Sequence, residues 1–154
     1  MNITLICVGK IKEDFFRDAL SEYSKRLSSY CSFNIIEVDD EPDSSGVTGA
    51  LKKEADRILK NIRAGMYVIT LEIKGKKFTS EGFSDKLSDL FLNGKSDIAF
   101  VIGGSNGLDK SVTDISDMAI SFSDMTFPHQ LMRVILSEQI YRAFRIMRNE
   151  PYHK

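Results

Sequence analysis

Tryptophan is absent from the 154-residue sequence, and proline, cysteine and histidine are scarce, with three, two and two residues. The two cysteines, Cys7 and Cys31, form no CxxC pair, so we expect neither a disulfide framework nor a metal site. No apolar run approaches the roughly 20 residues of a membrane-spanning helix. The first apolar run is too short for a signal peptide and follows no charged segment. These absences predict a cytoplasmic protein with no membrane contact and no bound metal.

An excess of one charge is also missing, because the net charge is −1. The whole-molecule balance therefore favours no particular partner. The distribution is uneven, however. Residues 125–154 carry five Lys or Arg against two Glu, a balance of +3, and the first 124 residues carry 16 against 20, a balance of −4. A small basic patch at one end favours a local phosphate contact over a broad nucleic-acid surface.

Apolar runs alternate with amphipathic segments along the whole chain, which predicts a single α/β domain over residues 1–154. The predicted strands span residues 3–8, 33–38, 67–73 and 98–102, with a possible short fifth strand at 119–122. The predicted helices span residues 12–30, 47–63, 83–91, 109–119 and 128–149. Residues 39–46 read as a loop, and KGKK at 74–77 as an exposed turn or connection rather than a phosphate site. Since most strands are continuous apolar runs, we expect a mainly parallel sheet with helices on both faces.

The stretch DIAFVIGGSNGL, residues 97–108, places glycines directly after a buried strand and before a helix. Ligands of open α/β sheets bind beyond the carboxyl ends of strands, and glycine lets the backbone approach a ligand closely. The same glycines could serve only a tight turn. No Gly-Lys-Ser/Thr follows and the spacing is not G-x-G-x-x-G, so neither a Walker loop nor a Rossmann dinucleotide site is supported.

The stretch FSDMTFPHQ, residues 122–130, joins a strand end to the start of the last helix. Phe122, Met125 and Phe127 could form an apolar slot, with backbone groups between them to pair with an adenine edge. They could equally be core residues beneath a loop. Pro128 suits a first helical position, because its missing N–H costs nothing there.

The last helix is apolar on more than one face, so we expect part of it to pack against another subunit. A polar stripe runs along it, formed by Glu138, Arg142, Arg145 and Asn149. The stripe fits an exposed face with a Glu–Arg pair somewhat better than an anion-handling surface.

The two histidines lie at opposite ends of this helix, which spans roughly 30 Å at 1.5 Å per residue. His129 is at its head, and His153 lies beyond its end in the terminal PYHK. One chain cannot easily bring both to one site. In a two-fold dimer with antiparallel helices, the tail of one subunit could reach the helix head of the other.

Three stretches together resemble the ribosomal RNA large subunit methyltransferase H family, a branch of the SPOUT class. They are ITLICVGKIKE (3–13), FVIGGSNGL (100–108) and SFSDMTFPHQLMRVILSEQIYRAFRIMRNEPYHK (121–154), and the resemblance covers essentially the whole chain. It implies a C-terminal trefoil knot, which sequence physics alone would not predict. It also implies a homodimer that binds S-adenosylmethionine and methylates N3 of a pseudouridine in 23S ribosomal RNA, on the assembled ribosome.

The resemblance further implies which residues act. The cofactor would be bound by Leu71, Gly103, Phe122, Ser123, Asp124, Met125, Thr126 and Phe127. Tyr152 and His153 would clamp and polarise the target base, Arg142 would add positive charge, and His129 would order the cofactor loop or the tail. The methyl donor is already activated, so no metal is implied, and the group that accepts the N3 proton stays open. The alternatives are a non-catalytic ribosome- or RNA-binding factor and a flavodoxin-type nucleotide-binding enzyme.

Overall fold

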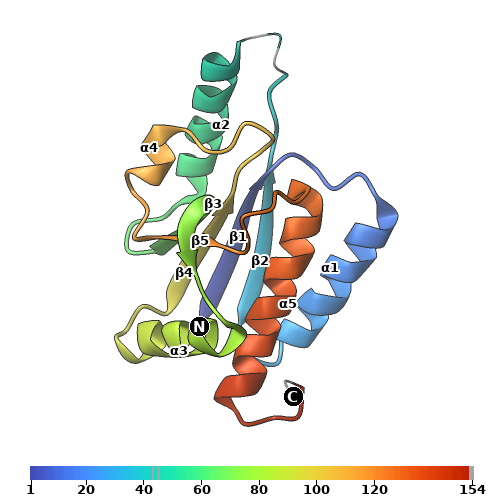
Figure 1. Ribbon diagram of the computed structural model, residues 1–154, viewed down its shortest axis with the longest axis vertical. Coiled ribbons are helices and arrows are strands. Elements are labelled where there is room, and N and C mark those ends of the chain that lie inside the picture. The colour runs from blue at the N-terminus through green and yellow to red at the C-terminus, as the bar shows by residue number, and fades with distance from the viewer. Residues whose placement is uncertain (43, 45, 153–154) are drawn as a thin grey trace.

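The structure is a computed structural model that describes residues 1–42, 44 and 46–152, and within them one sheet of five strands lies between two layers of helices (Figure 1). The strands are β1 (Asn2–Val8), β2 (Ser32–Val38), β3 (Tyr67–Lys77), β4 (Asp97–Ile102) and β5 (Met118–Ser121). The helices are α1 (Asp14–Leu27), α2 (Val47–Asn61), α3 (Ser80–Leu92), α4 (Lys110–Thr113) and α5 (His129–Met147). Neighbouring strands pair in parallel in the order β2-β1-β4-β3-β5. The predicted α/β class with a parallel sheet is confirmed.

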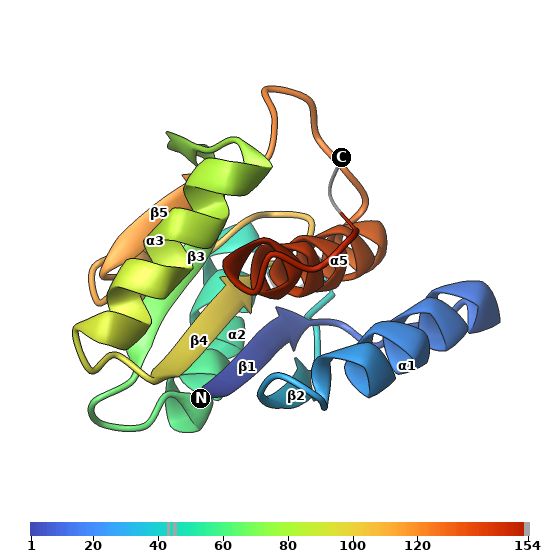
Figure 2. The ribbon, with the colours of Figure 1, turned by 90° about the horizontal axis from the view of Figure 1, so that it is seen from below.

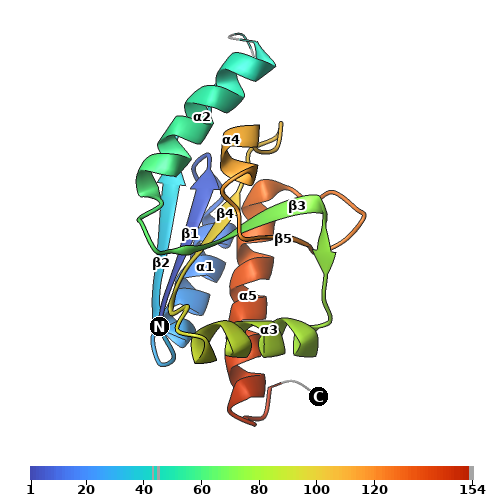
Figure 3. The same cartoon turned by 90° about the vertical axis from the view of Figure 1, so that its left-hand side faces the viewer.

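Helices cover both faces of the sheet. Helix α5 lies between α1 and α3 on one face (Figure 2), and α2 and α4 lie on the other (Figure 3). Alternate side chains of β1 serve the two layers: Leu5 and Cys7 join the core under α5, whereas Ile6 and Val8 join the core under α2. All four are fully or almost fully buried. The continuous apolar run of this strand is therefore the consequence of burial on both faces.

Strand β3 is longer than the sequence predicted. Residues 74–77 belong to the strand instead of forming a turn, because β3 bulges after Leu71 and then pairs again with β5 through Lys76. The close approach of β3 to β5 requires glycine at position 75, because a Cβ on Gly75 would lie 2.4 Å from the carbonyl carbon of Ile120. The lysines at 74, 76 and 77 are exposed, as the sequence predicted for this run.

Several other predicted boundaries were wrong, among them both ends of α1, which spans Asp14–Leu27 and not 12–30. Helix α4 is one turn long and does not reach residue 119, because the carboxylate of Asp117 accepts a hydrogen bond of 2.8 Å from the Val68 amide and returns the chain to the sheet. Pro128 precedes α5 with ψ of 132° rather than occupying its first helical position. The helix ends at Met147, shortly before Asn149, which adopts a positive φ of 52°.

Helix α5 has seven buried side chains, and no residue from His129 to Met147 is fully exposed. Its position between α1 and α3 explains much of its apolar character within one chain. No helix in residues 1–42, 44 and 46–152 is long and apolar enough to cross a membrane. The trefoil knot stays a prediction, because strand order and pairing do not trace how the chain threads.

Candidate functional site

The predicted cofactor residues converge on one edge of the sheet. Strands β4, β3 and β5 are neighbours. Leu71 lies just before the bulge of β3, where it pairs with Ile120 of β5, and the preceding Thr70 pairs with Val101 near the carboxyl end of β4. Gly103 directly follows β4, and residues 122–127 directly follow β5. Because all three strands are parallel, these segments meet at the same end of the sheet, where ligands of open α/β sheets bind.

The glycine loop after β4 is folded tightly on itself. Gly104 and Gly107 form an isolated antiparallel bridge, and Gly107 has φ of 82°. A Cβ on Gly103 would lie 2.4 Å from the carbonyl oxygen of Gly107, so a side chain there would displace backbone. The tight strand-to-helix turn is thus confirmed, while its role as a ligand loop stays a prediction.

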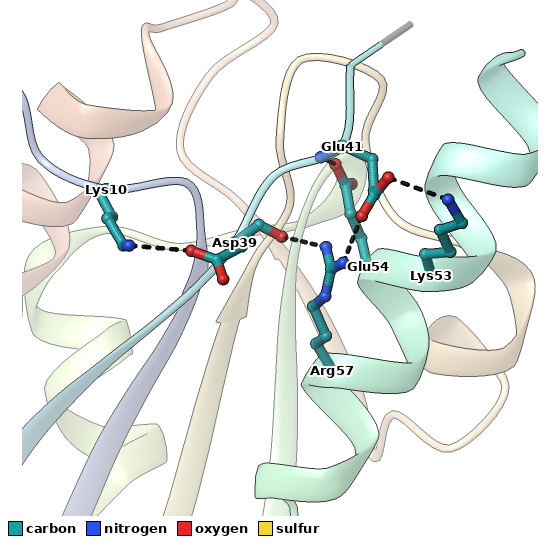
Figure 4. A network of polar contacts seen from close by, with 6 residues as sticks. All are labelled: Lys10, Asp39, Glu41, Lys53, Glu54 and Arg57. Carbon is teal, nitrogen blue, oxygen red and sulfur yellow. Dashed lines mark hydrogen bonds and ion pairs between the residues drawn. The ribbon is translucent and has the colours of Figure 1, made fainter. Parts of the chain in front are cut away.

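A polar network lies on the α2 side of the sheet, near this loop (Figure 4). Its members come from the ends of β1 and β2 and from α2: Lys10, Asp39, Glu41, Lys53, Glu54 and Arg57. The buried carboxylate of Glu54 accepts a 2.9 Å hydrogen bond from the Glu41 amide, and its other oxygen lies 3.7 Å from where a Gly104 Cβ would be. Arg57 donates to the Asp39 carbonyl at 2.7 Å and pairs with Glu41. The network joins Asp39 and Glu41, which follow β2, to helix α2, and Glu54 places it near Gly104.

The segment 122–127 is held by short polar contacts and leaves two apolar side chains outside the core. Asp124 forms an ion pair with Lys77 of β3 at 2.5 Å, and the hydroxyl of Ser123 accepts from the Met125 amide at 3.0 Å. Met125 is 74% exposed and Phe127 39% exposed, so the reading of both as core residues was wrong. Phe122 is half-buried and packs against the core.

Behind this segment lies a cavity of about 230 Å³ between α3, α5 and the end of β5. It is lined mainly by apolar side chains, together with three hydroxyl groups and one amide: Phe78, Thr79, Ser80, Phe83, Ile120, Ser121, Phe122, Ile135 and Gln139. Ser80 donates a 2.8 Å hydrogen bond to Gln139 across it. The predicted apolar slot is therefore only partly formed in this chain, since Phe122 lines the cavity and Met125 and Phe127 do not.

His129 lies where α5 begins, above the carboxyl end of β1. Its Nε2 atom is 3.5 Å from the position that a Gly9 Cβ would occupy, and Asp40 approaches the same point. Burial lowers the pKa of His129 below its usual value, and the positive charge of Arg133 lowers it further, against the opposing effect of Asp40. The imidazole is therefore mostly neutral at pH 7, which suits a hydrogen-bonding or proton-accepting group.

The sequence did not predict a structural or functional role for Arg133. Its side chain is fully buried and donates to the carbonyl oxygens of Val8 and Gly9 at 2.6 and 2.8 Å and to Glu37 at 3.0 Å. These contacts tie the first turns of α5 to the ends of β1 and β2. The only available signal was an arginine within an apolar helical face, at a position where an aliphatic side chain would be expected.

Arg142 and Tyr152 lie together at the other end of α5. The Arg142 guanidinium carbon is 4.8 Å from the centre of the Tyr152 ring, and both side chains contact Glu138. Glu138 forms a 2.6 Å ion pair with Arg142 and accepts a 3.2 Å hydrogen bond from the Tyr152 hydroxyl. The Glu–Arg pair expected from the polar stripe is confirmed, but the expectation of an exposed face was wrong, because the side chains of Glu138 and Arg142 are only 18% and 25% exposed. The pair offsets much of the Arg142 charge within the chain.

The three predicted catalytic residues with a described placement, His129, Arg142 and Tyr152, are not brought together in one chain. His129 and Arg142 are 13 positions apart on one helix, which is about 20 Å at 1.5 Å per residue. Tyr152 accompanies Arg142, and His153 lies outside the described residues. One chain therefore places His129 beside the strand ends and the Arg142–Tyr152 pair at the opposite end of α5.

The residues around the strand ends suit an adenosine-type ligand. Met125 and Phe127 present exposed apolar surface next to irregular backbone, which fits the flat face and polar edge of the adenine of S-adenosylmethionine. Among the residues with a described placement, no cluster of three His, Cys, Asp or Glu side chains could hold a metal ion. Binding of S-adenosylmethionine by these residues stays a prediction.

Comparisons with known proteins agree with this arrangement. The family model described as "Predicted SPOUT methyltransferase" matches residues 1–153. Proteins from Ruminiclostridium cellulolyticum and Clostridium botulinum, both named ribosomal RNA large subunit methyltransferase H, are 54% and 55% identical, with all of this chain and all of each relative covered.

A solved structure titled as a probable methylase family protein from Haemophilus influenzae shares the fold. Its TM-score is 0.54 at 15% identity, and the match covers 99% of this chain and 70% of that one. The family match over nearly the whole chain and the full-length relatives lead to the same assignment: this chain belongs to the SPOUT methyltransferase family, in the group of ribosomal RNA large subunit methyltransferase H.

Proposed function

We propose that this protein transfers the methyl group of S-adenosylmethionine to N3 of a pseudouridine in 23S ribosomal RNA, acting in the cytoplasm on the assembled ribosome. The observation that carries the proposal is the convergence of Leu71, Gly103 and residues 122–127 at one sheet edge, in a chain of this methyltransferase family. The choice of ribosomal RNA as substrate is supported by the names of the full-length relatives.

The residues at the strand ends would hold the cofactor. Backbone of the glycine loop and of residues 122–127 would pair with its polar groups, and Leu71, Met125 and Phe127 would contact its apolar faces. When bound, S-adenosylmethionine supplies an activated methyl group. The chain's own residues would then position the target base in line with that group and assist the loss of the N3 proton.

The proton is the chemical problem, because a uracil-type N3 keeps its hydrogen near neutral pH. Burial raises the pKa of Tyr152 to about 12, and hydrogen bonding to Tyr23 and the charge of Glu138 act in the same direction. Tyr152 is therefore protonated at neutral pH, so it would donate a hydrogen bond to a ring carbonyl instead of removing the proton. This would stabilise the negative charge that develops on the ring.

The separation along α5 favours a site shared between two chains. One chain leaves about 20 Å between the strand-end groups and the Arg142–Tyr152 pair. A two-fold dimer would place the tail of one subunit at the strand ends of the other. The half-buried apolar side chains of α5, among them Leu131, Ile135 and Ile146, would supply part of the contact between the subunits.

The activity is tested with tritium-labelled S-adenosylmethionine and ribosomes that lack the modification, followed by mass spectrometry of the 23S RNA. We expect N3-methylpseudouridine, with little methylation of protein-free RNA because single nucleotides are presented by the folded ribosome. A purified protein that binds no S-adenosylmethionine in calorimetry would instead support the non-catalytic binding factor.

The shared site is tested by mixing two inactive variants. Phe127→Asp disrupts the cofactor segment, and truncation after Glu150 removes the tail. If the tail serves the partner, each mixed dimer regains one intact site, and random mixing gives about a quarter of wild-type activity. If the tail serves its own chain, no mixture recovers activity.

A further inference from the structure

His129 is the first residue of α5 and lies at the edge of the candidate cofactor site. It follows Phe127, the last residue of the cofactor segment, by two positions, so their α-carbons are at most about 7 Å apart. At the carboxyl end of β1, its Nε2 atom is 3.5 Å and the Asp40 Cγ atom 3.9 Å from the position of a Gly9 Cβ. The imidazole is therefore close both to the strand ends and to the segment that would hold S-adenosylmethionine.

The imidazole of His129 has no structural partner. It forms no hydrogen bond and no ion pair with any residue that the structure describes, and neither of its nitrogens is a fully buried atom without a partner. Both nitrogens therefore keep contact with solvent on a side chain that is half-buried. Arg133, one turn further along α5, instead donates to two carbonyl oxygens and a carboxylate. Since polar groups that serve the fold are hydrogen-bonded, His129 is available to a ligand.

Charged groups from three parts of the chain act on this imidazole. Burial lowers the pKa of His129, and the positive charges of Arg133 in α5 and of Lys12 before α1 lower it further. Asp40, which follows β2, acts in the opposite direction. The charge of Arg133 is itself offset by an ion pair with Glu37 of β2 at 3.0 Å. The result is a mostly neutral imidazole at pH 7, which can take up a proton and return it to water.

Other groups around the strand ends are less suited to accept a proton. The carboxylate of Asp124 is paired with Lys77, and that of Glu54 accepts the Glu41 amide. A general base is most effective when its pKa lies near the operating pH, and an imidazole titrates closer to neutral pH than a carboxylate or a phenol. His129 is therefore the best-matched base at this edge of the sheet.

We propose that His129 accepts the N3 proton of the target pseudouridine during methyl transfer, and that Asp40 stabilises the imidazolium that forms. The proposal rests on the proposed function. As N3 bonds to the methyl carbon, the carbon–sulfur bond breaks with its electron pair left on sulfur, and the N3 proton passes to an imidazole nitrogen. The products are the methylated base, S-adenosylhomocysteine and an imidazolium, which then releases its proton to water. The partner subunit's Tyr152 would meanwhile donate a hydrogen bond to a ring carbonyl.

The test is specific because the chain has only two histidines, His129 and His153. Single-turnover methyl transfer to ribosomes that lack the modification is measured from about pH 5.5 to 9 for wild type, His129→Gln, His153→Gln and Asp40→Asn. The imidazole signals of the same proteins are titrated by NMR, which gives the pKa of His129 independently of activity. Calorimetry with S-adenosylmethionine, and recovery of activity on return from low pH, check that each protein stays folded.

We expect the wild-type rate to be constant at high pH and to fall with the pKa of His129 seen by NMR, which lies below about 6.5. His129→Gln should lower the rate on the order of a hundredfold to ten-thousandfold. Its remaining rate should rise with pH, because N3 must then lose its proton to solvent. Asp40→Asn should move the NMR pKa and the fall in rate together to lower pH. His153→Gln should leave the fall at its wild-type position.

A wild-type pH profile in His129→Gln overturns the proposal. Loss of the fall in His153→Gln also overturns it, because the proton would then pass to the tail. If His129→Gln binds no S-adenosylmethionine, Asp40→Asn decides, and a pH profile that does not follow its NMR pKa contradicts the role of His129. Wild-type protein that forms no N3-methylpseudouridine at any pH refutes the proposed function itself.

Discussion

Replacing Arg133 by methionine should destabilise the protein far more than removing an arginine from its surface. The Arg133 side chain has no exposed area, and its guanidinium donates hydrogen bonds to the Val8 and Gly9 carbonyls and to the Glu37 carboxylate. Breaking a buried ionic network by removing one partner costs about 3–5 kcal/mol, because the remaining groups lose their partners without regaining water. The Glu37 side chain keeps 31% of its exposure and can partly rehydrate, so we expect the lower end, about 3 kcal/mol.

The measurement is urea unfolding at one fixed protein concentration, since dimerisation would otherwise shift the midpoint. With a urea dependence of about 2 kcal/mol/M, the midpoint should fall by about 1.5 M. The control is Arg63→Met, which removes an ion pair with Asp97 whose arginine is 66% exposed and should cost less than about 1 kcal/mol. Glu37→Gln retains an acceptor and should lie between the two. Equal midpoints for Arg133→Met and Arg63→Met would refute the role given to the buried arginine.

Three further predictions use backbone geometry and titration. Gly75→Ala should destabilise the protein by at least about 2 kcal/mol, because the new Cβ would lie 2.4 Å from the β5 backbone. Gly49→Ala in α2 has no atom within 4 Å of the new Cβ and should stabilise the protein by about 0.5–1 kcal/mol. Similar unfolding midpoints for the two variants would contradict this prediction. Burial raises the pKa of Cys7 to about 12 and of Cys31 to about 11. A disulfide reagent at pH 8 should therefore label neither thiol in the folded protein and both thiols in urea. Rapid labelling of the folded protein would contradict their burial. The pKa of His129 is lower in the folded protein than in the unfolded chain, so the imidazole of the unfolded chain is protonated first as the pH falls. The free energy of unfolding should therefore decrease below about pH 6.5. His129→Gln should reduce this pH dependence in unfolding measurements.

The sequence was informative where one local rule decides the structure. Continuous apolar runs such as residues 98–102 indicated strands buried on both faces, and the parallel α/β class followed from their alternation with helices. The same reading failed at residues 74–77, where lysines and a glycine looked like a turn. There, pairing with β5 keeps the segment extended, and that partner is more than 40 residues away in the sequence.

The candidate site was likewise predictable from the sequence only in part. The motifs located Leu71, Gly103 and residues 122–127, and only the strand order β4-β3-β5 brings them to one edge. Arg133 was not predicted because its partners lie at the ends of β1 and β2, about 100 positions or more away in the sequence.

By itself the sequence determined the alternation of strands and helices, the glycine turn after β4 and the apolar character of α5, because each depends on residues close together in the chain. The tertiary structure alone decided which strand ends adjoin, which arginine is buried and which is stacked on a ring, and how far Arg142 and Tyr152 lie from His129. These depend on contacts between distant segments, whose geometry is fixed only when the whole sheet and its two helical layers pack together.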